Sequence, residues 1–183
     1  MTNNDCLVLG EVEKIYQDVS EWLKFAEAKH AGLFAVWVAV LGMTVKLDGL
    51  QGMGKTFQTA FIIAVCIGIL IELLAFFPFL NRVSFIKRMC YKKYCRYSGN
   101  AVFYQSVFVD TYSNGNVSEA VDKYMYILQQ RGLITDSSIL VKDYVRQIIE
   151  VAETGTIKIY LFSIAAKYTV LVVLSAIVML IIA

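Results

Sequence analysis

Three long apolar stretches constrain this chain of 183 residues more than any other feature of its sequence. They cover residues 31–45, 57–80 and 168–183. A transmembrane helix needs about 20 mostly apolar residues, so the middle stretch can cross a bilayer, and the other two can be lengthened by apolar residues that precede them. A hydrophobic content of 58% and a mean hydropathy of +0.60 also exceed those of ordinary soluble domains. The sequence therefore predicts a mainly α membrane protein with three transmembrane helices.

The distribution of charge predicts how these helices are oriented. The connection between the first two stretches, residues 46–55, has two lysines and one aspartate. Lysine and arginine collect on the cytoplasmic side of membranes. Directly after the second stretch come six basic residues with no acid among them, namely Arg82, Lys87, Arg88, Lys92, Lys93 and Arg96. We therefore expect a cytoplasmic N-terminus, a cytoplasmic segment between the second and third helices, and a C-terminus outside.

Helical periodicity extends the membrane spans into the cytoplasm. Apolar residues recur at helical spacing from Val12 to Ala26, which predicts an amphipathic helix that runs into the first span. The same spacing from Val141 to Ala152 predicts a helix, opened by Asp136, that is continuous with the third span. The predicted fold thus has cytoplasmic helical extensions in addition to its three spans.

Between the second and third spans we expect a small cytoplasmic insert. Residues 101–109 are rich in β-branched and aromatic side chains and precede a turn signal at 113–116, so they predict a short strand-like segment. Ser118 is expected to open a further helix and Gly132 to close it.

The resulting organisation has four parts. They are a cytoplasmic amphipathic helix at 1–30, two transmembrane helices with a short outer hairpin at 31–80, a cytoplasmic basic segment with the insert at 81–157, and the third transmembrane helix at 158–183.

A phosphate-loop pattern in the hairpin does not predict nucleotide binding. Residues 49–56 match GxxxxGK[ST]. A working loop of this kind follows a strand of a parallel sheet, whereas this one connects two membrane spans on the expected outer side. A glycine-rich turn between antiparallel helices explains the motif better.

Glu72 is the only acid inside an expected span. A central charge there costs roughly 2.5–3.5 kcal/mol, so a partner or a neutral state is expected. Two interpretations carry equal weight: Glu72 lines a polar seam or pore, or it pairs with Lys167 or Lys29 as a tie between helices. Lys167 is otherwise expected to extend its ammonium toward the lipid head groups. The single histidine, His30, is assigned to the membrane interface.

Cations and aromatic residues alternate from Arg82 to Tyr97. One interpretation is an anchor on anionic lipid head groups, where each cation contributes about 1 kcal/mol. In the other, Lys92, Lys93 and Arg96 hold a phosphate beside the insert while nearby tyrosines stack on a base. Because tyrosines in membrane proteins commonly form interfacial belts, both interpretations stay open.

We expect no catalytic centre, metal site or cofactor. Because the chain has one histidine, its sequence does not indicate a Ser-His-Asp or Cys-His arrangement. The four cysteines lack the paired spacing of a zinc site and are interpreted as reduced thiols. A net charge of +2 is too small to indicate a protein that coats a nucleic acid polymer.

Three patches of the sequence, taken in order, resemble one family. The first is WLKFAEAKHAGL at 22–33, which leads into the first span. The second is NAVFY at 100–104, followed by SEA at 118–120 and a helix that contains Tyr-Met. The third is KDYVRQII at 142–149, which continues to AKY at 166–168. Their order and spacing around the spans are similar to those of Pycsar-type transmembrane effectors of bacterial antiphage defence.

Two departures from the family pattern concern the ligand. Glu27 stands where the family has Asp, and Ala101-Val102 replaces Leu-Leu. They leave open a related membrane effector that responds to a different nucleotide.

The resemblance implies a receiver in the inner membrane of a bacterium. A cyclic nucleotide made during phage infection, with a cyclic pyrimidine mononucleotide favoured over a cyclic oligonucleotide, would bind the insert, and the membrane part would then impair membrane integrity and arrest or kill the cell. The implied partners are this nucleotide, the lipid bilayer and further copies of the chain as a homo-oligomer, with no nucleic acid polymer. The ligand-binding residues expected on this basis are Lys92, Lys93, Arg96, Asn100, Tyr104 and Gln105.

Two other function classes compete with the effector. One is a passive membrane anchor or scaffold that docks a cytoplasmic partner, and the other is a proton or ion carrier that uses Glu72. An enzyme is the least favoured class. A cyclic nucleotide that raises the thermal midpoint of the purified protein would distinguish the effector from the anchor.

Overall fold

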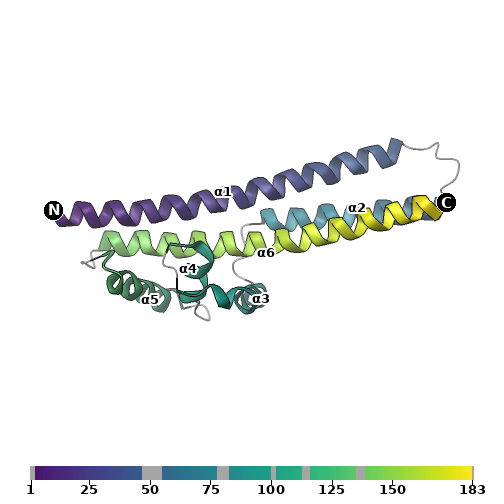
Figure 1. The fold of residues 1–183 in the computed structure, drawn as a ribbon. Helices are drawn as coiled ribbons and strands as arrows, with labels where there is room; N and C mark the ends of the chain where they lie inside the picture. Colours follow the sequence, from purple (N-terminus) through teal and green to yellow (C-terminus); the bar gives the residue numbers. More distant parts are fainter. Residues whose placement is uncertain are drawn as a thin grey trace. The chain divides into compact units, whose positions relative to one another are not determined.

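The structure is a computed structural model that describes residues 3–46, 55–77, 83–99, 102–112, 116–134 and 139–182. In these residues the secondary structure consists of six α-helices and one 3₁₀ turn, with no strand (Figure 1). Two helices of 44 residues each, α1 (Asn3–Lys46) and α6 (Ile139–Ile182), dominate the chain. The prediction of a mainly α protein is confirmed.

Three helical segments of the described residues are long and apolar enough to cross a membrane. They are Leu9–Thr44, Thr56–Phe76 and Ile139–Val178. The three predicted spans are therefore present, and the chain is a multi-pass membrane protein. Helices α1 and α6 also confirm that the first and third spans are continuous with the helices that precede them.

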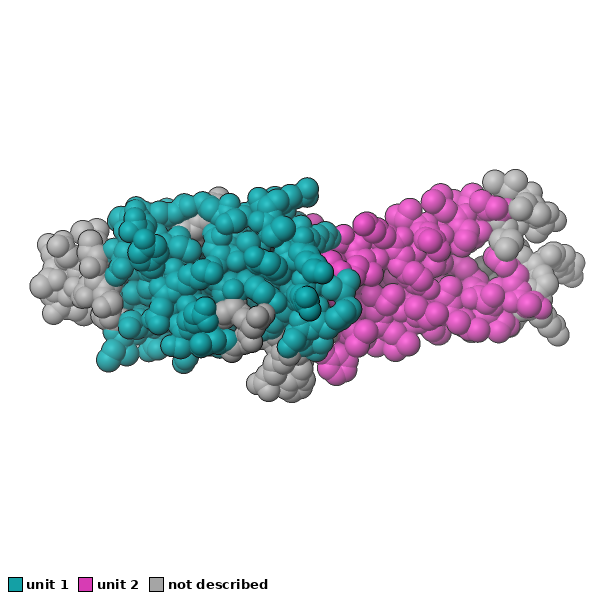
Figure 2. Space-filling model, turned by 90° about the horizontal axis from the view of Figure 1, so that it is seen from below, with its two compact units in different colours: residues 1–26, 79–158 teal, residues 27–78, 159–183 magenta. Residues whose placement is uncertain are grey.

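The chain divides into two compact units (Figure 2). Unit 1 contains residues 1–26 and 79–158, and unit 2 contains residues 27–78 and 159–183. Unit 2 holds most of the apolar spans, whereas unit 1 holds the short helices between α2 and α6.

In unit 2, α1 and α2 (Lys55–Phe76) pack antiparallel. Near one end of the pair, the Gln58 side-chain amide donates a hydrogen bond to the Thr44 carbonyl at 3.4 Å. Near the other end, His30 Nδ1 lies 2.5 Å from Glu72 Oε2. Residues 47–54, which carry most of the phosphate-loop pattern, lie outside the described residues.

Helix α6 completes the core of unit 2. Trp37 of α1, Val65 of α2 and Val172 of α6 are all buried and form one hydrophobic cluster. The Tyr168 hydroxyl donates a hydrogen bond to the backbone carbonyl of Ala64 at 2.9 Å, which ties α6 to α2. Trp37, Val65 and Val172, one from each helix, thus form the centre of this unit.

Unit 1 is built on amphipathic faces. Buried residues recur at intervals of three, four or seven positions, which is helical spacing, along α1 (Val12, Ile15, Val19, Ala26) and along α6 (Val141, Val145, Ile148, Ala152). These are the stripes that the sequence predicted. An ion pair between Lys87 and Glu153 ties α3 (Ser84–Tyr94) to α6.

Helix α5 (Val117–Gln130) has well-defined ends. The Asn116 side chain accepts a hydrogen bond from the Glu119 amide at its start, so Asn116 is the cap where the sequence suggested Ser118. Gly132 has a φ of 67°, a left-handed conformation that suits glycine and closes the helix as predicted.

The predicted strand at 101–109 is wrong. Residues 104–110 form helix α4 (Tyr104–Asp110), and every side chain from Tyr104 to Val109 is buried. A segment buried on all sides shows no alternation of polar and apolar residues, so its pattern cannot separate a strand from a short helix. Asp110 anchors the helix, because it accepts hydrogen bonds from the Ser98 hydroxyl at 2.5 Å and the Gly99 amide at 3.0 Å.

Candidate functional site

An aromatic cluster in unit 1 joins helices that are far apart in the sequence. The Trp22 ring of α1 stacks on Tyr104 of α4, with 5.3 Å between ring centroids and an interplanar angle of 29°. Phe103 meets the same indole edge-on at 6.2 Å. Tyr97, from the 3₁₀ turn η2 (Cys95–Tyr97), lies 6.2 Å from Phe103. Stacked aromatic rings of this kind can accept a nucleobase.

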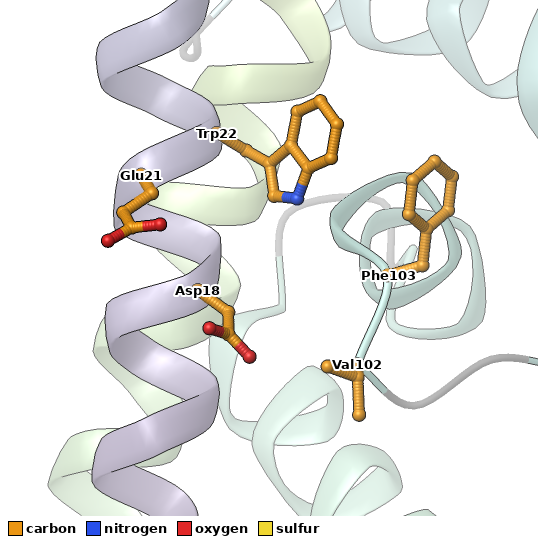
Figure 3. Close-up of a pocket in the computed structure, with 5 residues that line it drawn as sticks. All are labelled: Asp18, Glu21, Trp22, Val102 and Phe103. Atoms are coloured by element: carbon orange, nitrogen blue, oxygen red, sulfur yellow. The ribbon is translucent and has the colours of Figure 1, made fainter.

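Beside this cluster the surface is hollowed. The hollow has a volume of about 230 Å³ and is lined by Asp18, Glu21, Trp22, Val102 and Phe103. Helix α1 supplies the first three residues from adjacent turns, and the segment just before α4 supplies the last two. Figure 3 shows Asp18 and Trp22 projecting from α1 toward Val102 and Phe103, while Glu21 extends on the other side of the helix.

The lining of the hollow is acidic and aromatic. Among the described residues it contains two carboxylates and no cation. Neither the Asp18 nor the Glu21 side chain forms a hydrogen bond or ion pair with another described residue. Trp22 is 41% exposed, so part of its side chain remains accessible to a ligand although the ring stacks on Tyr104 and meets Phe25 and Phe103 edge-on. The hollow therefore suits a flat group that carries N–H donors.

A cation reaches the cluster through Tyr97. The Arg96 guanidinium lies 5.1 Å from the Tyr97 ring centroid, and its Nη2 donates a hydrogen bond to the Tyr97 hydroxyl at 3.3 Å. Since Tyr97 also contacts Phe103, a positive charge is linked to a wall of the hollow without lining it.

Two of the predicted site residues support the cluster from behind. Tyr104 and Gln105 are buried, and the Gln105 amide donates a hydrogen bond to the Tyr104 hydroxyl at 3.1 Å. Burial raises the pKa of Tyr104, so its hydroxyl stays protonated at neutral pH. These residues hold the ring that stacks on Trp22, but they do not line the hollow.

The other predicted residues are distributed differently. Lys92 and Lys93 are exposed on α3, and Lys93 Nζ lies 5.2 Å from the Tyr94 ring centroid. Asn100 lies outside the described residues. Arg96 is thus connected to the wall of the hollow through one ring, Tyr97, and Lys93 through two, Tyr94 and Tyr97.

Sequence reasoning missed Asp18, Trp22 and Phe103 as site residues. The position of Trp22 fits the helical spacing of the apolar stripe of α1, so the pattern places it in that stripe. The Trp22 ring contacts Phe103 and Tyr104, which lie 81 and 82 positions further along the chain. No local sequence pattern encodes such a contact. A tryptophan on a stripe whose other members, apart from Tyr16, are aliphatic is the signal that could have indicated it.

Unit 2 contains a second polar site within its apolar core. Glu72 and His30 are 0% and 1% exposed, and Glu72 Oε1 has no hydrogen-bond partner among the described residues. The His30 ring packs edge-on against Phe162 at 5.6 Å. The structure therefore gives Glu72 a histidine partner where the sequence offered Lys167 or Lys29, and it buries His30, which was assigned to the interface. Lys167 is exposed.

The partner was missed because the sequence separates His30 and Glu72 by 42 positions. Each residue lies a similar number of turns from the connection between α1 and α2, so antiparallel packing brings them to the same level. Among the described residues, no group of three or more His, Cys, Asp or Glu side chains could hold a metal ion.

Comparison with known proteins gives one match. The family model of the Pycsar effector protein domain matches residues 11–183, which is nearly the whole chain. No curated protein and no solved structure matches it.

Proposed function

This chain belongs to the Pycsar effector family, and from that premise we propose that it is a receptor that binds a cyclic nucleotide in the cytosol and then impairs the inner membrane. Membership makes it a membrane effector of antiphage defence. The hollow beside Trp22 is the observation that supports a ligand site in unit 1. A cyclic pyrimidine mononucleotide is the favoured ligand, with a cyclic oligonucleotide as the alternative.

The charges of the hollow set the orientation of such a ligand. A phosphate would be repelled by Asp18 and Glu21, because like charges in a partly buried site raise the free energy of binding. The base therefore enters the hollow and stacks on the exposed part of the Trp22 ring, and its N–H donors point to the Asp18 carboxylate (Figure 3). The phosphate stays outside, on the side where Arg96 rests on Tyr97.

The response proposed for the membrane follows from helix α1. This single helix carries Trp22 of the hollow and, about two turns further on, His30 of the buried pair. A ligand changes an arrangement of helices only through a difference in its affinity for two arrangements. A ligand that binds Trp22 more tightly in one arrangement of α1 would therefore also favour one packing of the side chains around His30.

Self-association and orientation are part of the same proposal. Three spans in one chain are too few to enclose a pore, so several copies act together in the inner membrane, with the N-terminus in the cytoplasm as the positive charge of residues 82–96 suggests. The effector carries out no catalysis and disrupts the bilayer by rearrangement alone.

Two measurements test this function. Cyclic mononucleotides and dinucleotides are screened by the thermal midpoint of the detergent-solubilised chain, since a ligand of the folded state raises it. The ligand found is then added to dye-loaded liposomes that contain the chain. We expect leakage that depends on this ligand. Leakage indifferent to every nucleotide, or no thermal shift with any of them, would exclude the receptor and favour the anchor.

A variant links both measurements to the hollow. Trp22→Ala removes the stacking face and should weaken ligand binding by about 1–3 kcal/mol. Phe85→Ala is the matched control, because Phe85 is 70% exposed and belongs to the same unit but does not line the hollow. Equal loss in both variants would argue against the proposed position of the base.

A further inference from the structure

A second hollow of unit 1 lies between α5 and the beginning of α6. It has a volume of about 250 Å³ and is lined by Ser118, Val121, Asp122, Ile139, Lys142, Asp143 and Arg146. The residues of each helix are three or four positions apart, so each set occupies one side of its helix. We call this surface the α5–α6 face. It shares no residue with the hollow beside Trp22.

The α5–α6 face presents apolar side chains to the solvent. Ile139 is 81% exposed, and Tyr126, which continues the row of Ser118 and Asp122 along α5, is 61% exposed. Val121, the other apolar residue of the lining, is buried. An exposed branched side chain at the edge of a hollow allows one copy of the surface to insert into another.

The α5–α6 face carries equal numbers of acidic and basic side chains. Asp122 and Asp143 balance Lys142 and Arg146 in number, and none of the four side chains forms an ion pair or hydrogen bond with another described residue. A partner whose surface carried charges of a single sign would leave half of these charges unmatched. A surface that carries both acids and bases can be matched by a second copy of itself. In a two-fold interface every contact between residues occurs twice, so each acid of one copy can oppose a base of the other.

We propose that the α5–α6 face is a two-fold interface between copies of this chain. Ile139 of each copy inserts into the hollow of the other, and the acids of one copy oppose the bases of the other. Exposed ion pairs contribute little affinity, so the charges set partner and register while Ile139 and Tyr126 supply the buried contact. The inference rests on the self-association proposed above and is independent of the ligand.

Cross-linking of the full chain in lipid nanodiscs tests the interface. The probe is Ile139→Cys in a chain whose native cysteines are replaced by serine or alanine. Ile139 itself lines the hollow into which Ile139 of the other copy inserts, so the two positions lie close together and we expect a disulfide-linked dimer under mild oxidation. Phe85→Cys is the matched control for an exposed position of the same unit, and it should give no dimer.

Charge reversal makes the test specific to this surface. Lys142→Glu combined with Arg146→Glu places four acids on the face and should abolish the Ile139→Cys dimer. Adding Asp122→Lys and Asp143→Arg reverses every charge and should restore it. Lys123→Glu, an exposed change on another side of α5, should leave the dimer unchanged.

The possible failures are distinguishable. A chain without the cysteine probe that is monomeric by mass in nanodiscs would overturn self-association, and the proposed function would lose its oligomer. A chain that is oligomeric but gives no Ile139→Cys dimer, or whose dimer ignores charge reversal, would overturn this interface alone. Dimer loss without rescue would likewise reject the pairing of opposite charges.

Discussion

The indole of Trp37 lies against Gly68 so closely that a Cβ on the glycine would be 2.5 Å from the ring. Trp37 is 2% exposed and belongs to the cluster that joins all three helices of unit 2. The packing of α1 on α2 therefore requires a residue without a side chain at this position.

Gly68→Ala should destabilise the chain although alanine favours helices. The methyl group must displace a buried ring, and such overpacking typically costs about 1–3 kcal/mol. The thermal midpoint in detergent should fall. Gly42→Ala is the control, because a Cβ at Gly42 meets nothing within 4 Å and the exchange should be neutral or stabilising. An equal effect at both positions would show that Trp37 does not pack on Gly68.

Asp18→Asn should change which base the hollow prefers. A carboxylate only accepts hydrogen bonds, so it favours the exocyclic amino group of cytosine over the edge of uracil, where acceptor oxygens flank a single N–H. An asparagine amide both donates and accepts and can pair with either edge. Binding of cyclic CMP and cyclic UMP, measured by calorimetry, should therefore differ in the native chain and become more similar in the variant. Unchanged selectivity would mean that Asp18 does not contact the base.

His30 and Glu72 should depend on each other for stability. Removing one partner of a buried pair leaves an uncompensated polar group, so His30→Ala should cost about 3–5 kcal/mol. The double change His30→Leu with Glu72→Leu removes both polar groups and should lie closer to the native chain. Denaturation in detergent measures both variants. A double variant as unstable as the sum of its single changes would contradict the pairing.

Cys90 should resist thiol reagents that modify Cys95. Burial raises the pKa of Cys90 to about 12, so at pH 8 roughly one thiol in ten thousand is ionised. Cys95 is exposed. In a chain with Cys6→Ser and Cys66→Ser, a water-soluble maleimide should label Cys95 alone. Mass spectrometry of the labelled protein measures this.

The same thiol gives a pH dependence. Unfolding returns Cys90 to its ordinary pKa near 8.5. Above pH 8.5 the unfolded state therefore loses a proton that the folded state keeps. The contribution of Cys90 to stability is complete below this pH and declines as the pH rises toward 12.

Labelling of Cys90 at neutral pH in the folded chain would refute its burial.

The sequence predicted the features that depend on local pattern. Hydropathy located the three spans, and the spacing of residues such as Val12, Ile15 and Val19 identified the buried stripe of α1. The expectation that both long helices run without interruption into their spans was also correct, since Gly155 is accommodated within α6. Each of these features is determined by residues within a few turns of one another.

Features that depend on contacts between distant segments could not be predicted in this way. The partner of Glu72, the stack of Trp22 on Tyr104 and the hollow beside it all join residues at least 40 positions apart. The strand expected at 101–109 failed for a related reason, because complete burial by neighbouring helices removed the polar face that marks a helix. The roles of Lys92, Lys93 and Arg96 in binding a phosphate remain predictions.

Two polar contacts at different heights, His30 with Glu72 and Gln58 with Thr44, fix how α1 and α2 are aligned. A slip by one helical turn, about 5.4 Å, would break both contacts and leave a carboxylate facing hydrocarbon. The alignment is therefore independent of the number of residues in the connection 47–54. An epitope inserted there would leave the helices in register while antibody access reported which side of the membrane the connection occupies.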